Sequence, residues 1–349
     1  MKTALITGAA GQDGILLSRS LLADGYRVIG TVRDPGSVGR LATYAPGVEV
    51  RQLDIRDREG LGTMLRVERP DEIYNLASWS SVGQSWAHPW QVTEVNGLAV
   101  LGLMEELLSL HRSDDYHPRV CQASSSEMFG LSQATFQDET TGHHPRSPYA
   151  TAKSFAHHTI VNYRESYGIF VCGAVLFNHE SPLRPSTFVT RKITSGVAAI
   201  RLGRRDRLTL GRLDIRRDWG SADEFIVAMR RMLALPEPTD VCIATGVSHS
   251  LADFVNAAFL AVGIEDGLDR VEIDPLLHRP AEVMRTRGDA ARAKEILGWQ
   301  PERTFEGLVA WMVGVDIQRA LSDVEDDPTY LALEHGTSIS TGTTFDRPI

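Results

Sequence analysis

A glycine-rich turn stands directly after the first apolar segment of the chain. Ala4–Thr7 has the length of a short buried strand, and three glycines follow it in a Gly-x-x-Gly-x-x-Gly pattern. Gly14–Asp24 is amphipathic and is predicted to be a helix. Glycines between a strand and a helix allow a tight turn and a close approach of the backbone to a pyrophosphate, which the helix N-terminus then faces. The residues expected at the phosphates are Gly8, Gly11, Gln12, Asp13 and Gly14.

The segments that follow alternate between strand-like and helix-like patterns. The predicted strands are Tyr26–Val32, Val48–Leu53, Glu72–Ala77, Arg119–Ala123 and Gly168–Phe177. The helical patterns between them include Thr93–Leu110 and Tyr149–Tyr167. This alternation predicts an α/β fold with a Rossmann-like, doubly wound parallel sheet, because right-handed crossovers place helices on both of its faces.

The pattern changes in the second half. Asn178–Thr190 is predicted to be a loop, Leu208–Asp218 a charged strand, and Val241–Thr245 a further strand of the main sheet. Helices are predicted at Arg191–Leu202, Leu251–Val262 and Ala290–Leu297. The segment from Asp323 onward is acidic and then rich in Ser, Thr and Gly, so it is predicted to be a poorly ordered end, with a strap onto a partner subunit as the alternative.

Charge and cysteine content narrow the function classes. A formal net charge of −9 argues against a nucleic-acid partner, which needs a basic face, but a local basic pocket can still hold an anionic small ligand. The cysteines Cys121, Cys172 and Cys242 are far apart, and Cys/His groups with metal-ligand spacing are absent from the sequence. We therefore expect reduced thiols, no metal and a cytoplasmic protein. No run reaches the ~18 apolar residues of a membrane span, and the N-terminus resembles a core strand more than a signal peptide.

The end of the second strand is where a Rossmann protein contacts the ribose of its cofactor. An acid at this point would accept from the 2′-hydroxyl of NAD, whereas this chain has Val32 and then Arg33. An arginine suits a 2′-phosphate, so NADP is favoured over NAD. The alternative is that Arg33 is an exposed loop residue and that Asp34 serves the ribose. Further cofactor contacts are expected at Asp54 and Ile55 beside the adenine, and at Leu76, Ala77 and Ser78 beside the nicotinamide side of the pyrophosphate.

Tyr149 and Lys153 are one helical turn apart on the same face of a predicted helix. A tyrosine has an ordinary pKa of about 10, so it acts as a base near neutral pH only beside cations. Lys153 and the oxidised nicotinamide ring supply such cations. Tyr-x-x-x-Lys alone is common by chance, but after a Rossmann start it predicts hydride transfer, with both residues also contacting the cofactor.

Ser125 and Glu127 follow the fifth predicted strand, at the carboxyl edge where parallel sheets bind ligands. A serine there can hydrogen-bond a substrate hydroxyl and tune Tyr149. Glu127 favours a dehydratase over a plain dehydrogenase, because elimination needs a base for the C–H next to a ketone. The alternative is that Glu127 only stabilises a helix N-terminus.

From Gly8 to about Trp299 the chain resembles the GDP-mannose 4,6-dehydratases, a family of the extended short-chain dehydrogenase/reductase superfamily of NAD-dependent epimerase/dehydratase type. The blocks that carry this resemblance are Gly11–Gly14, Gln122–Ser124 with Ser126–Glu127, Pro145–Ala150 with Ala152–Lys153, Val161–Glu165, Leu176–Pro182, Phe188–Ile193, Arg217–Gly220 and Arg279–Val283. Several of these blocks are long and specific to the family.

The resemblance implies a hydro-lyase that uses NADP and is redox-neutral overall. Tyr149 would take the proton of the sugar 4-hydroxyl while a hydride leaves C4. Glu127 would then remove the C5 proton and help water leave from C6, and the hydride would return to C6 to give a 4-keto-6-deoxy sugar nucleotide. Ser125 stands where the family usually has threonine, and the hydroxyl group is retained.

The resemblance also implies a binding site for a GDP-sugar. Lys192, Arg217 and Arg279 would supply cations for the diphosphate and ribose, and Glu282 would accept from the guanine edge. The alternatives are a local ion pair of Arg217 with Asp218 and a surface pair of Arg279 with Glu282. The substrate-binding residues that the resemblance implies are Ser81, Ser85, Asn178, Val189, Lys192, Arg217, Arg279 and Glu282.

Three residues depart from the family pattern near the expected sugar. Trp79 and Ser81 lie in a changed segment, and Phe129 stands where tyrosine is usual. A GDP-manno-heptose is therefore the alternative to GDP-mannose. A 4-keto sugar-nucleotide reductase or epimerase, and more remotely a non-catalytic nucleotide-binding protein, also stay open, because the fold alone does not exclude them.

Assembly and domain limits are inferred in the same way. The superfamily commonly pairs subunits through the helices near Thr93–Leu110 and Tyr149–Tyr167, so a homodimer is expected. The loop after Arg33 lacks the run through which the family forms tetramers, so a tetramer stays only possible. The expected domains are an NADP-binding domain over 1–180 with about 218–250, a smaller mixed α/β sugar-nucleotide-binding lobe over 181–217 and 251–322, and a tail over 323–349.

Overall fold

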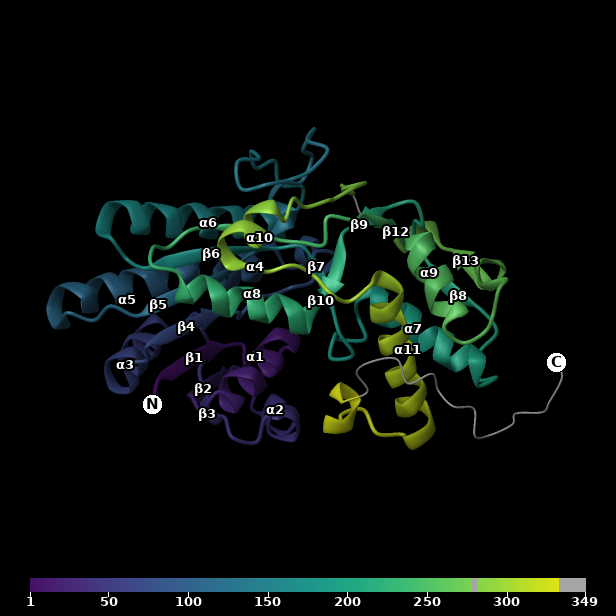
Figure 1. The fold of residues 1–349 in the computed structure, drawn as a ribbon, viewed down its shortest axis with the longest axis horizontal. Coiled ribbons are helices and arrows are strands. Elements are labelled where there is room, and N and C mark those ends of the chain that lie inside the picture. Colours follow the sequence, from purple (N-terminus) through teal and green to yellow (C-terminus); the bar gives the residue numbers. More distant parts are fainter. Residues whose placement is uncertain (278–280, 333–349) are drawn as a thin grey trace.

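A computed structural model describes residues 1–277 and 281–332. Its centre is a parallel sheet of seven strands in the order β11-β6-β5-β4-β1-β2-β3 (Figure 1). The predicted doubly wound parallel sheet is confirmed, including Val241–Ile243 as its last strand. The strands are β1 Thr3–Thr7, β2 Arg27–Val32, β3 Glu49–Gln52, β4 Glu72–Asn75, β5 Arg119–Ser125, β6 Val171–Leu176 and β11 Val241–Ile243.

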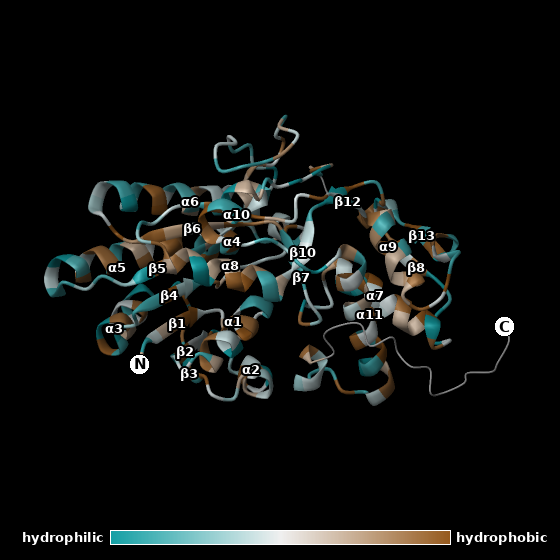
Figure 2. Cartoon of the chain, in the orientation of Figure 1, coloured by the Kyte–Doolittle hydropathy of each residue, from teal (hydrophilic) through white to brown (hydrophobic). Residues whose placement is uncertain are grey.

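Helices cover both faces of the sheet. One layer holds α3 Arg58–Glu68, α5 Ala99–Asp114 and α6 Pro148–Tyr167, and the other holds α1 Gln12–Ala23, α2 Val38–Tyr44, α8 Ala222–Ala234 and α10 Ala291–Leu297. Because successive side chains of a strand point to opposite faces, Leu5 joins one core while Ala4 and Ile6 join the other. Figure 2 shows hydrophobic residues along the inner strands and on the helix sides turned toward them.

A smaller lobe lies beyond the carboxyl edge of the sheet. It contains α7 Val189–Arg201, α9 Leu251–Leu260 and α11 Phe305–Ser322, which pack on one another, and the parallel pair β8 Leu208–Leu210 with β13 Val271–Ile273. Two short strand pairs connect it to the large domain: β7 Asn178–Glu180 with β10 Trp219–Ser221, and β9 Arg216–Arg217 with β12 His249–Ser250. The lobe therefore stands over the strand ends where ligands of such sheets bind.

Several local predictions differ from the structure. The loop predicted at 178–190 begins with β7, and the strand predicted at 208–218 is two strands, because β8 and β9 pair with different partners. The helix predicted at 93–110 is α4 Pro89–Thr93, a π-helical segment Glu94–Leu98 and α5. α8 and α11 were not predicted.

The start of the predicted tail is also ordered by packing. Residues 328–331 form a 3-10 turn, and Tyr330 and Leu331 are buried against the lobe. Trp311 of α11 donates its indole N–H to the Tyr330 carbonyl at 3.2 Å. The prediction of a poorly ordered end is therefore wrong for residues 323–332, because two apolar side chains in this acidic stretch are buried against the lobe. The rest of the predicted tail, 333–349, lies outside the described residues.

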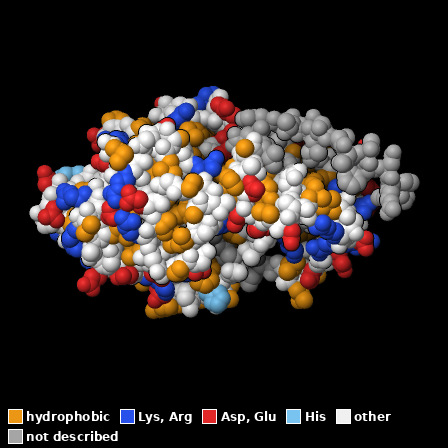
Figure 3. All heavy atoms as spheres, turned by 90° about the horizontal axis from the view of Figure 1, so that it is seen from below, with side chains coloured by type: hydrophobic (Ala, Val, Ile, Leu, Met, Phe, Trp, Pro, Cys, Tyr) orange, Lys and Arg blue, Asp and Glu red, His pale blue; other side chains and the backbone are white. Residues whose placement is uncertain are grey.

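The surface carries both signs of charge. Figure 3 shows acidic and basic side chains lying side by side over the face seen from below. Within residues 1–277 and 281–332, no helix combines the length and apolar character that crossing a membrane requires.

Candidate active site

The glycine turn brings three backbone segments unusually close together. Gly8 has φ +69°, and a Cβ on it would lie 2.9 Å from Cα of Ala77. A Cβ on Gly14 would lie 2.6 Å from Cα of Ala9, so α1 packs on the turn that follows β1 at a distance that only glycine allows. Gly11 is the N-cap of α1, and among the described side chains none caps its first turn. The turn thus fits a dinucleotide pyrophosphate at the helix N-terminus.

Gln12 and Asp13 tie this turn to β7. Gln12 Nε2 donates to the His179 carbonyl at 3.1 Å, and its Oε1 accepts from Ser181 Oγ at 2.9 Å. Asp13 Oδ2 lies 3.0 Å from His179 Nε2. Burial alone would raise the pKa of Asp13, but the charge and hydrogen bond of His179 outweigh it and lower that pKa to about 2. Asp13 lines the central cavity, and His179 is a partner that sequence reasoning missed.

The ribose end of the predicted cofactor site is open. Arg33 and Asp34 are exposed, and the Asp34 carboxylate accepts from the Gly36 N–H at 2.9 Å. Arg56 binds Asp54 at 2.6 Å and lowers its pKa, to which the charge of Arg33 adds. Ile55 is buried. Asp34 is thus engaged with its own turn, whereas Arg33 is near Asp54 and accessible to a ligand.

The residues that follow β4 are hydrogen-bonded to the last residue of β1. Thr7 Oγ1 accepts from the backbone N–H groups of Leu76 and Ala77 at 3.1 and 3.0 Å, which explains the close approach at Gly8. Leu76 and Ser78 line the central cavity. Ser78 Oγ also hydrogen-bonds Asn96 Oδ1 at 3.1 Å. These contacts position the predicted cofactor residues at the strand ends of β1 and β4.

Tyr149 and Lys153 lie in the first turns of α6, which is capped by Ser147 accepting from the Ala150 N–H. Lys153 Nζ donates to the Ala123 carbonyl at 2.9 Å and lies 5.9 Å from the centre of the Tyr149 ring. Ser125, at the end of β5, lies near enough to the Tyr149 hydroxyl to lower its pKa. The structure thus brings together the predicted tyrosine, lysine and serine, and buries all three.

Burial governs the protonation states of this group. It raises the pKa of Tyr149 to about 12, although Ser125 and the charge of Arg184 oppose the shift. Burial also lowers the pKa of Lys153 to about 8. In the chain without a ligand, Tyr149 therefore keeps its proton near neutral pH. Activation of Tyr149 by Lys153 together with a bound nicotinamide ring stays a prediction.

Glu127 lies one turn beyond Ser125, in the 3-10 segment Ser126–Met128. It lines the same cavity as Tyr149, and its Oε1 is 4.0 Å from Nε of Arg217. Its backbone N–H donates to Ser125 Oγ at 3.3 Å. The Glu127 carboxylate thus lines the same cavity as Tyr149 and Lys153.

The cavity has a volume of about 490 Å³, which is in the range of small-molecule sites. On the lobe side it is lined by Asn178, Val189, Lys192, Arg217 and Glu282, and at its entrance by Ser81. Ser85 is instead fully buried and donates to the Val82 carbonyl at 2.7 Å, so it supports the loop that carries Ser81. Arg279 lies outside the described residues.

Arg217 and Glu282 form a buried pair. Arg217 Nη2 donates to Glu282 Oε1 at 3.0 Å, and its Nη1 donates to the Val283 carbonyl at 2.7 Å. The alternative pairing of Arg217 with Asp218 is not what the structure shows, because Asp218 accepts from the Thr245, Gly246 and Gly288 N–H groups. The Arg217 guanidinium and the Glu282 carboxylate therefore both border the cavity.

Arg184 is a second cavity residue that sequence reasoning missed. Its Nε donates to Glu180 Oε2 at 2.7 Å, and its Nη2 to the His179 carbonyl at 2.6 Å. Its charge lowers the pKa of both Tyr149 and Asp13. The only sequence signal was a basic residue inside the block after Ser181, and spacing alone does not place it beside Tyr149.

A tyrosine–lysine pair over a glycine-rich Rossmann turn, with a lobe above the strand ends, defines the short-chain dehydrogenase/reductase class. A sequence model described as GDP-mannose 4,6 dehydratase matches residues 5–312. The chain belongs to the GDP-mannose 4,6-dehydratase family.

Two curated relatives illustrate the match. GDP-mannose 4,6 dehydratase 2 of Arabidopsis thaliana is 42% identical over 334 residues, which cover 91% of this chain and 88% of that protein. GDP-mannose 4,6-dehydratase of Vibrio cholerae is 39% identical over 91% of this chain and 95% of its own length. Among solved structures, UDP-glucose 4-epimerase of Thermotoga maritima shares the fold, with a TM-score of 0.79 and 20% identity over 92% of this chain and 99% of that one.

Proposed function

We propose that the chain is a hydro-lyase that converts GDP-mannose to its 4-keto-6-deoxy derivative with NADP. The observation that carries this proposal is Glu127, a carboxylate in the same cavity as Tyr149 and Lys153. A dehydrogenase or epimerase has no step that needs this base, whereas elimination does. Family membership, with relatives named as GDP-mannose 4,6-dehydratases, supports the same reaction.

Each side chain has a distinct task in this reaction. Tyr149 takes the proton of the sugar 4-hydroxyl, Ser125 hydrogen-bonds that hydroxyl and the tyrosine, and Lys153 stabilises the tyrosinate. NADP⁺, held at the glycine turn and beside Tyr149 and Lys153, would supply the acceptor for the C4 hydride and its donor to C6. Glu127 removes the proton at C5, which the 4-ketone has made acidic, and passes it to the C6 hydroxyl, which leaves as water. The proton that Tyr149 took from the 4-hydroxyl is returned at C5 when the hydride reaches C6, so electrons and atoms balance with water as the only loss.

The nucleotide end is proposed to lie under the smaller lobe. Lys192 and Arg217 supply positive charge for the diphosphate, and Glu282 provides an acceptor for the guanine N–H donors. Asn178 and Val189 border the sugar and the first phosphate. Arg217 is already held by Glu282, so substrate binding would exchange one of its hydrogen bonds for a phosphate oxygen.

NADP is proposed over NAD because of the residues that follow β2. Arg33 is exposed at the ribose position, whereas the Asp34 carboxylate is engaged by Gly36. An arginine is complementary to a 2′-phosphate. Arg33→Ala should weaken NADP⁺ binding and leave NAD⁺ binding nearly unchanged, as measured by calorimetry. Equal weakening of both would assign the ribose contact to another residue.

The direct test is incubation of the purified protein with GDP-mannose and NADP⁺, followed by mass spectrometry of the nucleotide sugar. Loss of about 18 mass units, one water, without net reduction of the cofactor is the expected result. Consumption of added NADPH with a keto-sugar nucleotide would instead show a reductase.

One observation favours a second sugar. Ser80, Ser81 and Gly83, three small residues, line the cavity in the segment that departs from the family pattern. A lining of small residues is compatible with a sugar that is one carbon longer. GDP-manno-heptose is therefore the second candidate substrate, and the same assay with this compound distinguishes the two.

We also propose a homodimer. Exposed apolar side chains gather on α4, the π-helical segment and α6, where these three elements pack together. Trp90 is 70% exposed, and Leu98 and Phe155 are 48% and 44% exposed. A contiguous apolar face on a folded protein is typical of a subunit interface.

A further inference from the structure

Three arginines from distant parts of the chain bind consecutive carbonyls of one loop. Arg191 of α7 donates to the carbonyls of Pro182 and Arg184, both at 2.7 Å. Arg319 of α11 donates to the Pro182 carbonyl at 2.9 Å, and Arg40 of α2 donates to the Leu183 carbonyl at 2.8 Å. The loop after β7 is therefore fixed by side chains rather than by a strand partner.

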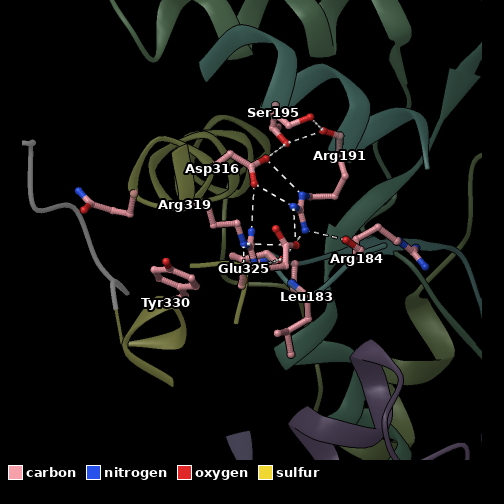
Figure 4. Close-up of polar contacts among 12 residues, drawn as sticks. Leu183, Arg184, Arg191, Ser195, Asp316, Arg319, Glu325 and Tyr330 are labelled. Carbon is pink, nitrogen blue, oxygen red and sulfur yellow. Dashed lines mark hydrogen bonds and ion pairs between the residues drawn. The ribbon is translucent and has the colours of Figure 1, made fainter. Parts of the chain in front are cut away.

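Acidic residues neutralise these arginines. Asp316 of α11 lies 3.0 Å from both Arg191 and Arg319, and Figure 4 shows it between them. Three of these side chains are 2–6% exposed, so one carboxylate faces two buried guanidinium groups. Burying an excess positive charge is costly. A second anion beside the two arginines therefore lowers the cost of burying them.

That anion comes from the segment that follows α11. Glu325 lies 3.4 Å from Arg191 and 3.6 Å from Arg319, and the next residue, Asp326, lies 3.2 Å from Arg40. The segment is anchored beyond these acids by Tyr330, as described above. Two adjacent carboxylates thus complete the charge balance of all three arginines.

The loop held in this way carries a side chain to the reacting end of the cavity. Arg184 lies inside it, and its carbonyl is one of those that Arg191 binds. Arg184 and Tyr149 line the same cavity, and the positive charge of the Arg184 guanidinium, which binds Glu180, lowers the pKa of Tyr149. A shift of the loop would therefore move a cation relative to the catalytic tyrosine.

We propose that Arg40, Arg191 and Arg319, with Glu325 and Asp326, are positioning residues that hold Arg184 in the cavity that Tyr149 also lines. They act through the 182–184 backbone and do not touch the substrate. This inference rests on the proposed dehydratase activity for its kinetic readout, but the loop geometry is testable without turnover.

The experiment compares Arg40→Met with Arg231→Met in the full-length protein. Arg231 of α8 also donates to a backbone carbonyl, that of Gly298 after α10, at 2.7 Å, so it is a control that contacts neither α2 nor the 182–184 loop. Arg40→Met should lower kcat with GDP-mannose about tenfold, because small misplacements near the reacting atoms are costly, with little change in KM. Arg231→Met should keep the parent value.

The pH profile separates positioning from general destabilisation. With Arg184 displaced, the positive charge that lowers the pKa of Tyr149 is weakened, so this pKa rises. The acid limb of the kcat profile, which reports the tyrosine losing its proton, should therefore move to higher pH in Arg40→Met only. In combination with Arg184→Lys, the loss in kcat should be smaller than the product of the two single losses.

Hydrogen exchange supplies the readout that needs no turnover. The Leu183 N–H donates to Ser181 Oγ and the Arg184 N–H to the Ser181 carbonyl. Both amides should exchange several-fold faster in Arg40→Met than in the control. Unchanged exchange together with an unchanged pH profile would overturn the positioning role, whereas an inactive parent protein with faster loop exchange would overturn the proposed function alone.

Discussion

At the scale of single residues, the site depends on two kinds of information. The tyrosine and lysine are four positions apart on a helix, so their spacing alone predicts that they share a face. Glu127 and Arg217 lie in different domains, and only the fold brings them within 4.0 Å. The proposed chemistry uses both, because hydride transfer is assigned to the local pair and elimination to Glu127.

Tyr149→Phe should lower turnover about 100-fold or more while GDP and NADP⁺ binding stay near the parent value. The change removes the acid–base hydroxyl and keeps the ring that packs with Trp79 and Val82. Mass spectrometry of the product and calorimetry of nucleotide binding measure the two quantities. Binding that falls in parallel with turnover would assign Tyr149 a structural role.

Glu127→Gln should stop the reaction after oxidation at C4. The amide does not remove the C5 proton, so reduced cofactor should accumulate on the protein when GDP-mannose is added, and its absorbance should rise. Glu282→Gln is the comparison, because it lies on the nucleotide side of the same cavity and should weaken substrate binding without trapping reduced cofactor. Full turnover by Glu127→Gln would exclude it as the elimination base.

The pair of Asp13 and His179 should make stability depend on pH in the acid range. The folded pKa of Asp13 is about 2, below its ordinary value of 3.8, so its stabilising contribution is present above pH 4 and is lost as pH falls toward 2. The contribution is on the order of 2 kcal/mol. Urea unfolding of Asp13→Asn and of the parent should differ by this amount at pH 5 and converge near pH 2. A constant difference would show that the Asp13 carboxylate is not held ionised by the fold.

At the scale of elements, the sequence predicts the helices and strands that local residue patterns determine. The strands of the main sheet and the glycine turn were predicted because buried runs and a strand–turn–helix order are local features. β7, β9 and β12 have two or three residues each, which is too short for a hydrophobic periodicity to be recognised in the sequence. These strands form because of their pairing partners. The position of Arg184 and the order of the segment after α11 also depend on tertiary contacts, so local patterns do not predict them.

Helix α9 offers a test of such local determination. Ser250 accepts from the Asp253 N–H at 3.0 Å, and the Asp253 carboxylate accepts from the Ser250 N–H at 2.7 Å, a complete capping box. Ser250→Ala should lower the free energy of unfolding by about 1 kcal/mol, whereas Ser250→Thr, which keeps the hydroxyl, should lower it less. Chemical denaturation measures both. Equal losses would mean that packing, and not the cap, sets the cost.

At the scale of the whole molecule, one cavity is lined by residues of both the sheet domain and the smaller lobe. The sheet contributes the glycine turn and the tyrosine–lysine pair, and the lobe contributes the cations and the carboxylate of the nucleotide end. The lobe is connected through short strand pairs and through the arginines that bind the 182–184 loop. The reaction therefore depends on a stable position of the lobe relative to the sheet, and local sequence patterns do not predict that position.

The proposed homodimer is a property of the whole molecule, and the exposed side chain of Phe155 offers a test of it. Phe155 faces outward on α6 beside Gly97 of the π-helical segment, and a glutamate there would place a charge in the centre of the proposed interface. Burying an unpaired carboxylate is unfavourable, so Phe155→Glu should shift sedimentation from dimer toward monomer at micromolar concentration. Leu276→Glu is the control, because Leu276 is 91% exposed and lies on the smaller lobe, away from this face. If Phe155→Glu stays dimeric, or if the parent protein is itself a monomer, the α4–α6 face is not the subunit interface and the exposed Trp90 needs another partner.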